Sequence, residues 1–352
     1  MARSYSSLNE IFDHGFDTVI DVRSPAEFAE DHVPGAISLP VLDNEERARV
    51  GTIYKQQSPF LARKLGAALV FRNAAGHIEG PLSHHDGGWR PLVYCWRGGQ
   101  RSGAFEWMLK EIGWRAEKID GGYRTYRRLV TKALYEDSLP HRFIQLGGYT
   151  GTAKTALLPR LAARGVQVID LEGLARHRGS LLGDMPGGQP SQKGFETELA
   201  LALSKLDPAR PVVVEAESSK VGQILVPPSL WAGMKAARWI EVGAPLEARA
   251  VYLDAAYDDI LSDGDRLKAQ LDPLRYHRGH ALVDSWGALI DAGERIALCR
   301  SLAADHYDPA YEKSMAAMAP DVMERFETPT LDDAGLDRLA DRIAERLHTS
   351  EM

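Results

Sequence analysis

Residues 141–155 read HRFIQLGGYTGTAKT, an apolar run that leads into a glycine-rich turn and ends in Lys154 and Thr155. The apolar run predicts a buried strand, and the residues that follow the turn predict a helix. A turn between a strand and a helix N-terminus directs several backbone N–H groups to one point, which favours an anion there. The stretch therefore predicts an α/β fold with a phosphate site where one strand ends.

This turn follows the Walker A pattern with one departure, because Ala153 stands where the pattern has the glycine before the lysine. In that pattern the backbone holds phosphate oxygens, Lys154 supplies positive charge and the hydroxyl of Thr155 is a ligand of Mg²⁺. The phosphate-binding residues that we expect are Gly148, Gly151, Thr152, Lys154 and Thr155. Asp170 and Glu215, which end two later strand candidates, are the candidates for the Walker B acid.

Further strands and helices are expected to alternate along the chain. The short apolar runs that predict buried strands are 17–22, 91–94, 116–120, 141–146, 166–171 and 211–215. Alternation of this kind is typical of parallel sheets covered by helices. Beyond Arg249 the pattern is mainly helical and ends in an exposed amphipathic helix at 331–347, and a polar loop is expected at 74–90.

These patterns predict an α/β protein with three regions. We expect an α/β domain over 1–130, a second α/β domain with the phosphate loop over 131–250, and a mainly helical region over 251–352 that packs on the second domain. With 44% hydrophobic and 26% charged residues, the composition excludes a disordered chain.

No membrane association is expected, because the chain lacks both an uncharged run of ~20 residues and an N-terminal signal segment. Its two cysteines fit a reducing compartment, so we expect the cytoplasm. The net charge of -7 argues against unspecific coating of nucleic acid.

A second loop of interest covers residues 94–102, which read YCWRGGQRS. Cys95 ends a predicted strand just before a predicted helix, so backbone N–H groups, the helix N-terminus, Arg97 and Arg101 would all stabilise its thiolate. We therefore expect Cys95, Arg97 and Arg101 to be catalytic. Cys299 has apolar neighbours at helical spacing and is expected in the core.

The segments 21–28 (DVRSPAEF) and 31–36 (DHVPGA) resemble the N-terminal signature of the rhodanese domain, and 94–102 resembles its active loop. The resemblance implies a cysteine that carries sulfur or selenium. Cys95 and Arg101 also fit the Cys-x5-Arg spacing of cysteine phosphatases. A cysteine phosphatase fused to a small-molecule kinase is therefore an alternative, and a noncatalytic tRNA-binding protein is a third hypothesis.

A rhodanese domain followed by a P-loop domain resembles the tRNA 2-selenouridine synthase family. The blocks that carry this resemblance are 94–99, 170–180, 189–196, 215–222 and 306–311. The resemblance implies a transferase that replaces the sulfur of the wobble 2-thiouridine in tRNA by selenium, through an S-geranylated intermediate. It implies selenophosphate and geranyl diphosphate as co-substrates, no tightly bound cofactor, and Mg²⁺ as a candidate ion at Thr155.

The partners implied are a tRNA, through its anticodon loop, and an enzyme that produces selenophosphate. Cationic and amide side chains suit the phosphates of a diphosphate or of RNA, and such contacts make binding salt-dependent. The residues that we expect to bind substrate or RNA are Arg124, Arg127, Arg128, Arg176, Arg178, Gln192 and Lys193.

Overall fold

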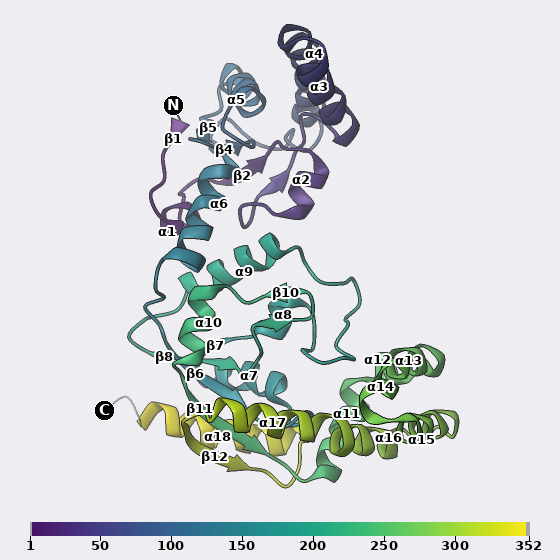
Figure 1. Cartoon of the computed structure of the whole chain (residues 1–352). Helices are drawn as coiled ribbons and strands as arrows, with labels where there is room; N and C mark the ends of the chain where they lie inside the picture. The colour runs from purple at the N-terminus through teal and green to yellow at the C-terminus, as the bar shows by residue number, and fades with distance from the viewer. Residues whose placement is uncertain (1, 350–352) are drawn as a thin grey trace. The chain divides into compact units, whose positions relative to one another are not determined.

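The computed structural model describes residues 2–349, which form two compact units (Figure 1). Unit 1 holds the residues up to Ser138 together with Pro190–Lys205. Unit 2 holds Leu139–Gln189 and the residues from Leu206 onward. Each unit is built on a five-stranded parallel sheet, so the predicted α/β class is confirmed.

The sheet of unit 1 has the strand order β1-β5-β4-β2-β3. Its strands are β1 (Ala2–Arg3), β2 (Thr18–Asp21), β3 (Ile37–Ser38), β4 (Pro91–Tyr94) and β5 (Glu117–Ile119). Ile20 pairs with Val93, and Asp21 pairs with Tyr94. The carboxyl ends of β2 and β4 therefore lie side by side, and Cys95 directly follows β4.

The helices of unit 1 lie between and after the strands of its sheet. They are α1 (Leu8–Phe12), α2 (Pro25–Glu30), α3 (Asn44–Gln56), α4 (Pro59–Glu79), α5 (Gln100–Ile112), α6 (Tyr123–Thr131), the π-helical turn η1 (Lys132–Glu136) and α9 (Gln192–Ser204). Ser24 and Glu27 form a capping box at α2. The prediction of a loop at 74–90 is wrong for its first residues, because helix α4 continues to Glu79 and buries Ala74.

Helix α9 returns to unit 1 from a distant part of the sequence. The Tyr126 hydroxyl donates a hydrogen bond to Thr197 Oγ1 at 3.0 Å, and Arg127 forms an ion pair with the buried Glu196. The hydroxyl of Tyr135 donates to the same carboxylate at 2.5 Å. The sequence-based boundaries place this segment in the second domain, because no change of composition marks its return.

The sheet of unit 2 has the order β12-β11-β6-β8-β7. Its strands are β6 (Arg142–Gly147), β7 (Gln167–Ile169), β8 (Pro211–Glu215), β11 (Arg238–Gly243) and β12 (Val322–Glu327), and β9 (Lys220–Val221) and β10 (Ile224–Leu225) form a separate hairpin. All six apolar runs predicted as strands are therefore strands. The region beyond Arg249 also contributes β12, which its helical surroundings concealed.

Helices cover this sheet and form a second core beside it. They are α7 (Lys154–Ala163), α8 (Leu171–Ala175), α10 (Pro228–Lys235), α11 (Leu246–Ala256), α12 (Asp258–Leu261), α13 (Gly264–Leu271), η2 (Asp272–Leu274), α14 (Arg275–Arg278), α15 (His280–Asp291), α16 (Arg295–Ser301), η3 (Leu302–Tyr307), α17 (Asp308–Met318) and α18 (Asp333–Thr349). Within residues 2–349, none of the helices is both long and apolar enough to cross a membrane.

Two details of unit 2 bear on the sequence-based expectations. Helix α18 is not an exposed helix, because Leu336, Leu339 and Ile343 are buried in the same cluster as the side chains of α7. Cys299 is buried among the helices as expected, and burial raises the pKa of its thiol to about 12. The mainly helical character of this region is confirmed.

Candidate active site

Cys95 lies at the N-terminus of α5. Its side chain is 3% exposed, and the hydroxyl of Ser102, on the first turn of α5, donates a hydrogen bond to its Sγ at 3.1 Å. The N-terminus of a helix favours a negative charge on such a sulfur and on any anion next to it. Cys95 therefore lies before the helix as expected, and Ser102 is a partner that the sequence did not single out. The catalytic role of Cys95, Arg97 and Arg101 stays a prediction.

Glycines bring the cysteine loop and α6 into direct backbone contact. The N–H of Tyr123 donates to the carbonyl of Cys95 at 2.8 Å, and the N–H of Arg124 donates to that of Trp96 at 3.1 Å. Gly122 has a φ of 59°, and a Cβ atom there would lie 2.2 Å from the Cys95 carbonyl oxygen. This close approach requires glycine at position 122.

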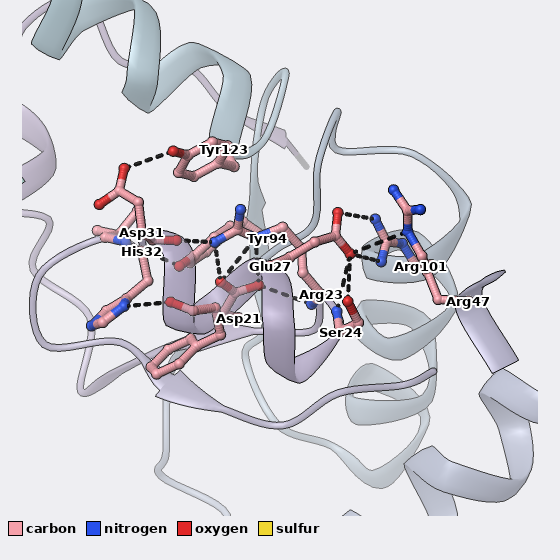
Figure 2. Close-up of polar contacts among 12 residues, drawn as sticks. Asp21, Arg23, Ser24, Glu27, Asp31, His32, Arg47, Tyr94, Arg101 and Tyr123 are labelled. Carbon is pink, nitrogen blue, oxygen red and sulfur yellow. Dashed lines mark hydrogen bonds and ion pairs between the residues drawn. The ribbon is translucent and has the colours of Figure 1, made fainter. Parts of the chain in front are cut away.

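A buried ion pair between Asp21 and Arg23 contacts Tyr123, the residue that binds the cysteine loop (Figure 2). Asp21 accepts hydrogen bonds from Arg23 Nε at 3.0 Å and from Nη2 at 2.7 Å, and both side chains are almost completely buried. The guanidinium of Arg23 lies 3.9 Å from the ring centroid of Tyr123, whose hydroxyl donates to Asp31 at 2.6 Å. Tyr123 in turn stacks with Trp96. The signature segment 21–36 thus positions the loop.

The two arginines of the loop differ in their surroundings. Arg97 is exposed, whereas Arg101 Nη1 donates to the carboxylate of Glu27 at 2.9 Å (Figure 2). Arg47 Nε lies 3.7 Å from the same carboxylate. Burial alone would raise the pKa of Glu27, but Arg101 outweighs it, and the pKa falls to about 2. Part of the positive charge of Arg101 is therefore neutralised by Glu27.

Glu27→Gln should make unit 1 less stable at neutral pH. A carboxyl with a lowered pKa contributes stability that is present above its unfolded value of 4.5 and is lost as the pH falls to about 2. The shift corresponds to at most roughly 3 kcal/mol, and solvent screening of this partly exposed carboxyl lowers the contribution. Hydrogen exchange of β2 and β4 measures the effect within unit 1.

The difference in protection between Glu27→Gln and the wild type should shrink between pH 4.5 and pH 2. Glu45→Gln, on an exposed position of α3, is the matched control and should leave protection unchanged. A difference that stays constant over this pH range would show that the ion pair with Arg101 does not act as described.

The phosphate loop of unit 2 joins β6 to α7. Lys154 Nζ donates to the carbonyl of Gly148 at 2.9 Å, and Thr152 Oγ1 donates to that of Tyr149 at 2.8 Å. Ala153 has a φ of 61°, a conformation that costs a residue other than glycine roughly 1–2 kcal/mol. The loop thus keeps its left-handed residue at position 153 although the sequence departs from the pattern there.

Carboxylates surround the first turn of α7. Glu215 ends β8, and its carboxylate accepts a hydrogen bond from the backbone N–H of Glu172 at 3.1 Å. Burial, followed by the charge of Glu172, raises the pKa of Glu215 well above its ordinary value. The Thr155 hydroxyl donates to Glu172 at 2.8 Å. Of the two Walker B candidates, Glu215 lies on the strand next to β6, whereas Asp170 caps α8 through the N–H of Gly173.

Glu172 and Glu217 were not expected at this site. Each follows a predicted acid by two positions, and this spacing was the available signal. Burial, followed by Glu172, raises the pKa of Glu217 to about 8. Within residues 2–349 no group of three or more histidine, cysteine or acidic side chains is arranged to hold a metal ion. Mg²⁺ at Thr155 would therefore need phosphate oxygens from a substrate, which is its usual mode of binding.

A cavity of about 660 Å³ adjoins the phosphate loop. Its polar lining includes Lys154, Thr155 and Glu172. Its apolar and aromatic lining is formed by Leu181, Met185, Tyr252, Leu253, Ala256, Tyr257, Tyr307 and Tyr311. The cavity therefore suits a molecule that combines phosphate groups with a hydrocarbon portion.

The residues expected to bind substrate or RNA have different surroundings. Arg178 lines the cavity of unit 2 and pairs with Asp259 at 3.0 Å, whereas Arg176 is exposed after α8. In unit 1, Arg124 and Arg128 are exposed one turn apart on α6. Arg127 and Gln192 both contact the carboxylate of Glu196. Lys193 contacts the carboxylate of Glu30.

Comparisons with known proteins agree with this division into two sites. Residues 4–129 match the model of the rhodanese-like domain, and residues 141–277 match that of the tRNA 2-selenouridine synthase AAA domain. The tRNA 2-selenouridine synthase of Nitrosomonas europaea is 36% identical over 262 residues, which cover 73% of this chain and 68% of that protein. That of Alcanivorax borkumensis is 34% identical over 337 residues, which cover 87% and 91%. The chain belongs to the tRNA 2-selenouridine synthase family.

Both candidate sites of this member of the tRNA 2-selenouridine synthase family lie within the regions that match the two domain models. The rhodanese-like match includes Cys95 and the segment 21–36, which holds Arg23 and Asp31. The AAA match includes the phosphate loop and Glu215, and it continues through α11 to α14. The resemblance inferred from the sequence is thereby confirmed.

Proposed function

We propose that this chain replaces the sulfur of the wobble 2-thiouridine of tRNA by selenium, with one reaction step in each unit. The observation that carries the proposal is the cavity of unit 2, which combines a phosphate loop with an apolar lining. Family membership supports the overall reaction, because the curated relatives are named for it. The buried thiol at the N-terminus of α5 supports a second reaction centre.

In the first step, geranyl diphosphate binds in unit 2. The phosphate loop and Lys154 hold the diphosphate, and Tyr252, Leu253 and Tyr257 contact the hydrocarbon chain. The sulfur of 2-thiouridine attacks the allylic carbon, the carbon–oxygen bond breaks, diphosphate leaves, and the base loses its N3 proton. Mg²⁺ beside Thr155 would neutralise charge on the departing diphosphate.

In the second step, the sulfur of Cys95 attacks C2 of the base, the bond from C2 to the S-geranyl sulfur breaks, and that sulfur leaves with the thiol proton as geranylthiol. The selenium of selenophosphate then attacks C2, a carbon–selenium bond forms and the bond to Cys95 breaks. Water finally breaks the selenium–phosphorus bond, which releases phosphate and leaves 2-selenouridine. Selenophosphate supplies the selenium, and its phosphate suits the exposed Arg97 and the N-terminus of α5. Arg101, paired with Glu27, lies on the first turn of that helix and fixes its position.

The tRNA meets unit 1 at the exposed side of α6. Arg124 and Arg128 follow the cysteine loop, so phosphate contacts there would bring the anticodon loop to Cys95. Arg176 and Arg178 contact the phosphates of the substrates that bind to unit 2. The reaction takes place in the cytoplasm, where thiols stay reduced and where an enzyme that makes selenophosphate can supply it.

The proposal is tested by omitting one co-substrate at a time. The full chain is incubated with tRNA that contains 2-thiouridine, and the wobble nucleoside is identified by mass spectrometry. Geranyl diphosphate alone should give S-geranyl-2-thiouridine, and both co-substrates together should give 2-selenouridine. Release of phosphate from aryl phosphates, with no change in the tRNA, would favour the phosphatase fused to a kinase, and tRNA binding without any modification would favour a binding protein.

Gly122→Ala should reduce the formation of 2-selenouridine at least tenfold, because the added Cβ would collide with the Cys95 carbonyl and displace the loop. Gly113→Ala is the matched control. Gly113 also has a positive φ, but a Cβ there meets nothing within 4 Å. Both variants lose stability through backbone strain, of order 1–3 kcal/mol, and Gly122→Ala loses more through the collision, so activity is compared where both variants are folded. Equal activity of the two variants would contradict the role of position 122.

A further inference from the structure

Unit 1 contains an apolar cavity that the proposed steps have not used. Its volume is about 430 Å³, and it is lined by α3, α4 and the first turn of α5. Most of the lining is aliphatic or aromatic, and it includes Val50, Tyr54 and Phe71. Tyr54 and Phe71 are 57% and 42% exposed, although large apolar side chains gain free energy when they are covered.

The cavity adjoins the core that surrounds Cys95. Leu42 and Val70 line the cavity and belong to the same cluster of buried side chains as Cys95. Gln100 and Arg101, which follow the cysteine loop, also line it. A group bound in the cavity therefore lies beside the cysteine loop.

The lining includes two arginines. Arg101 is paired with Glu27, whereas Arg63 is exposed and donates a hydrogen bond to the carbonyl of Pro59 at 3.2 Å. An uncharged chain can cover the apolar lining while the charge of Arg63 stays in solvent, so no unpaired charge is buried. The chemistry of the lining therefore suits a hydrocarbon chain whose polar end lies outside, at the cysteine loop.

We infer that this cavity binds the hydrocarbon chain of the S-geranylated nucleotide during the second step. The inference rests on the proposed function and names the substrate group that unit 1 recognises. The chain is attached to the sulfur that leaves, so its capture places C2 of the base at Cys95. Unmodified 2-thiouridine lacks this group and binds more weakly, which makes selenium incorporation follow geranylation.

The inference is tested by filling the cavity. Ala67 lines it from an exposed position of α4, so Ala67→Trp can occupy it without disturbing the core. With tRNA that already contains S-geranyl-2-thiouridine, this variant should raise the KM for selenium incorporation at least tenfold. Ala68→Trp, on the next exposed position outside the lining, is the matched control and should keep the wild-type KM. Tyr54→Ser, which removes apolar lining instead of adding bulk, should also raise the KM.

The length of the chain gives an independent readout. A buried CH₂ group contributes about 0.8 kcal/mol, or about fourfold in affinity, so a five-carbon dimethylallyl group should bind the wild type much more weakly than geranyl. Titration calorimetry with the two S-alkylated nucleosides measures this preference, and Ala67→Trp should lose it. The inference would be overturned if Ala67→Trp kept both the wild-type KM and the wild-type chain-length preference. It would also be overturned if the wild type were a dimer and Ala67→Trp alone dissociated it, because the cavity would then bind a second copy of the chain.

The proposed function and the inference fail in different ways. If geranyl diphosphate yields no S-geranyl-2-thiouridine with the wild-type chain, the proposed function is wrong. If that product forms normally in Ala67→Trp and selenium incorporation is also normal, only the inference is wrong.

Discussion

Cys95→Ser should lower the formation of 2-selenouridine at least a hundredfold and leave S-geranyl-2-thiouridine to accumulate on the tRNA. A serine hydroxyl is a much weaker nucleophile than a cysteine sulfur, so it should not attack C2 in the second step. The residue is buried at the N-terminus of α5, and serine is nearly the same size, so the fold of unit 1 should persist. In the proposed reaction the geranylation step takes place in unit 2 and does not need this thiol.

Cys299→Ser is the control for a general effect of removing a thiol. Cys299 is buried in the helical core of unit 2, so its replacement should lower stability without a selective loss of selenium incorporation. Mass spectrometry of the wobble nucleoside measures both products in one digest. Undiminished 2-selenouridine in Cys95→Ser would exclude Cys95 as the nucleophile of the second step.

Lys154→Ala should suppress geranylation at least a hundredfold. Lys154 lies within the phosphate loop, with its Nζ 2.9 Å from the carbonyl oxygen of Gly148, and it supplies the side-chain positive charge of that loop. Charge on the leaving diphosphate increases in the transition state, so loss of this charge acts mainly on the rate. Glu172 and Glu217 then face the diphosphate with less compensation.

The same variant should process tRNA that already contains S-geranyl-2-thiouridine at the wild-type rate. Lys154→Arg keeps the charge and is the control that separates loss of charge from loss of shape. Product analysis with geranyl diphosphate alone gives the rate of the first step. Wild-type geranylation by Lys154→Ala would show that the phosphate loop does not hold the diphosphate.

Local patterns in the sequence were sufficient for most of the fold. Each predicted strand is a short run of apolar residues, and each loop of interest joins such a run to a helix, so neighbouring residues contain the signal. Helix α9 could not be placed in this way, because its position depends on Glu196 and its partners in α6 and η1. The buried face of α18 depends equally on what packs against it, since an amphipathic pattern does not say what covers the apolar side.

The motif residues could be located from the sequence, but the residues that contact them could not. Cys95 and Lys154 belong to motifs whose spacing predicts a chemical role. Tyr123 is separated from Cys95 by 28 positions, and only the fold brings its N–H to the Cys95 carbonyl. Glu172 becomes relevant through its contact with the Thr155 hydroxyl, which the sequence does not reveal.

The central claim is that the two units carry two separable steps that are linked by an S-geranylated tRNA. The most direct test is to treat 2-thiouridine tRNA with Cys95→Ser and geranyl diphosphate, purify the tRNA, and pass it to Lys154→Ala with selenophosphate. We expect 2-selenouridine in this order and none when the two variants are used in the reverse order. Absence of 2-selenouridine in both orders, with each variant folded, would contradict the account.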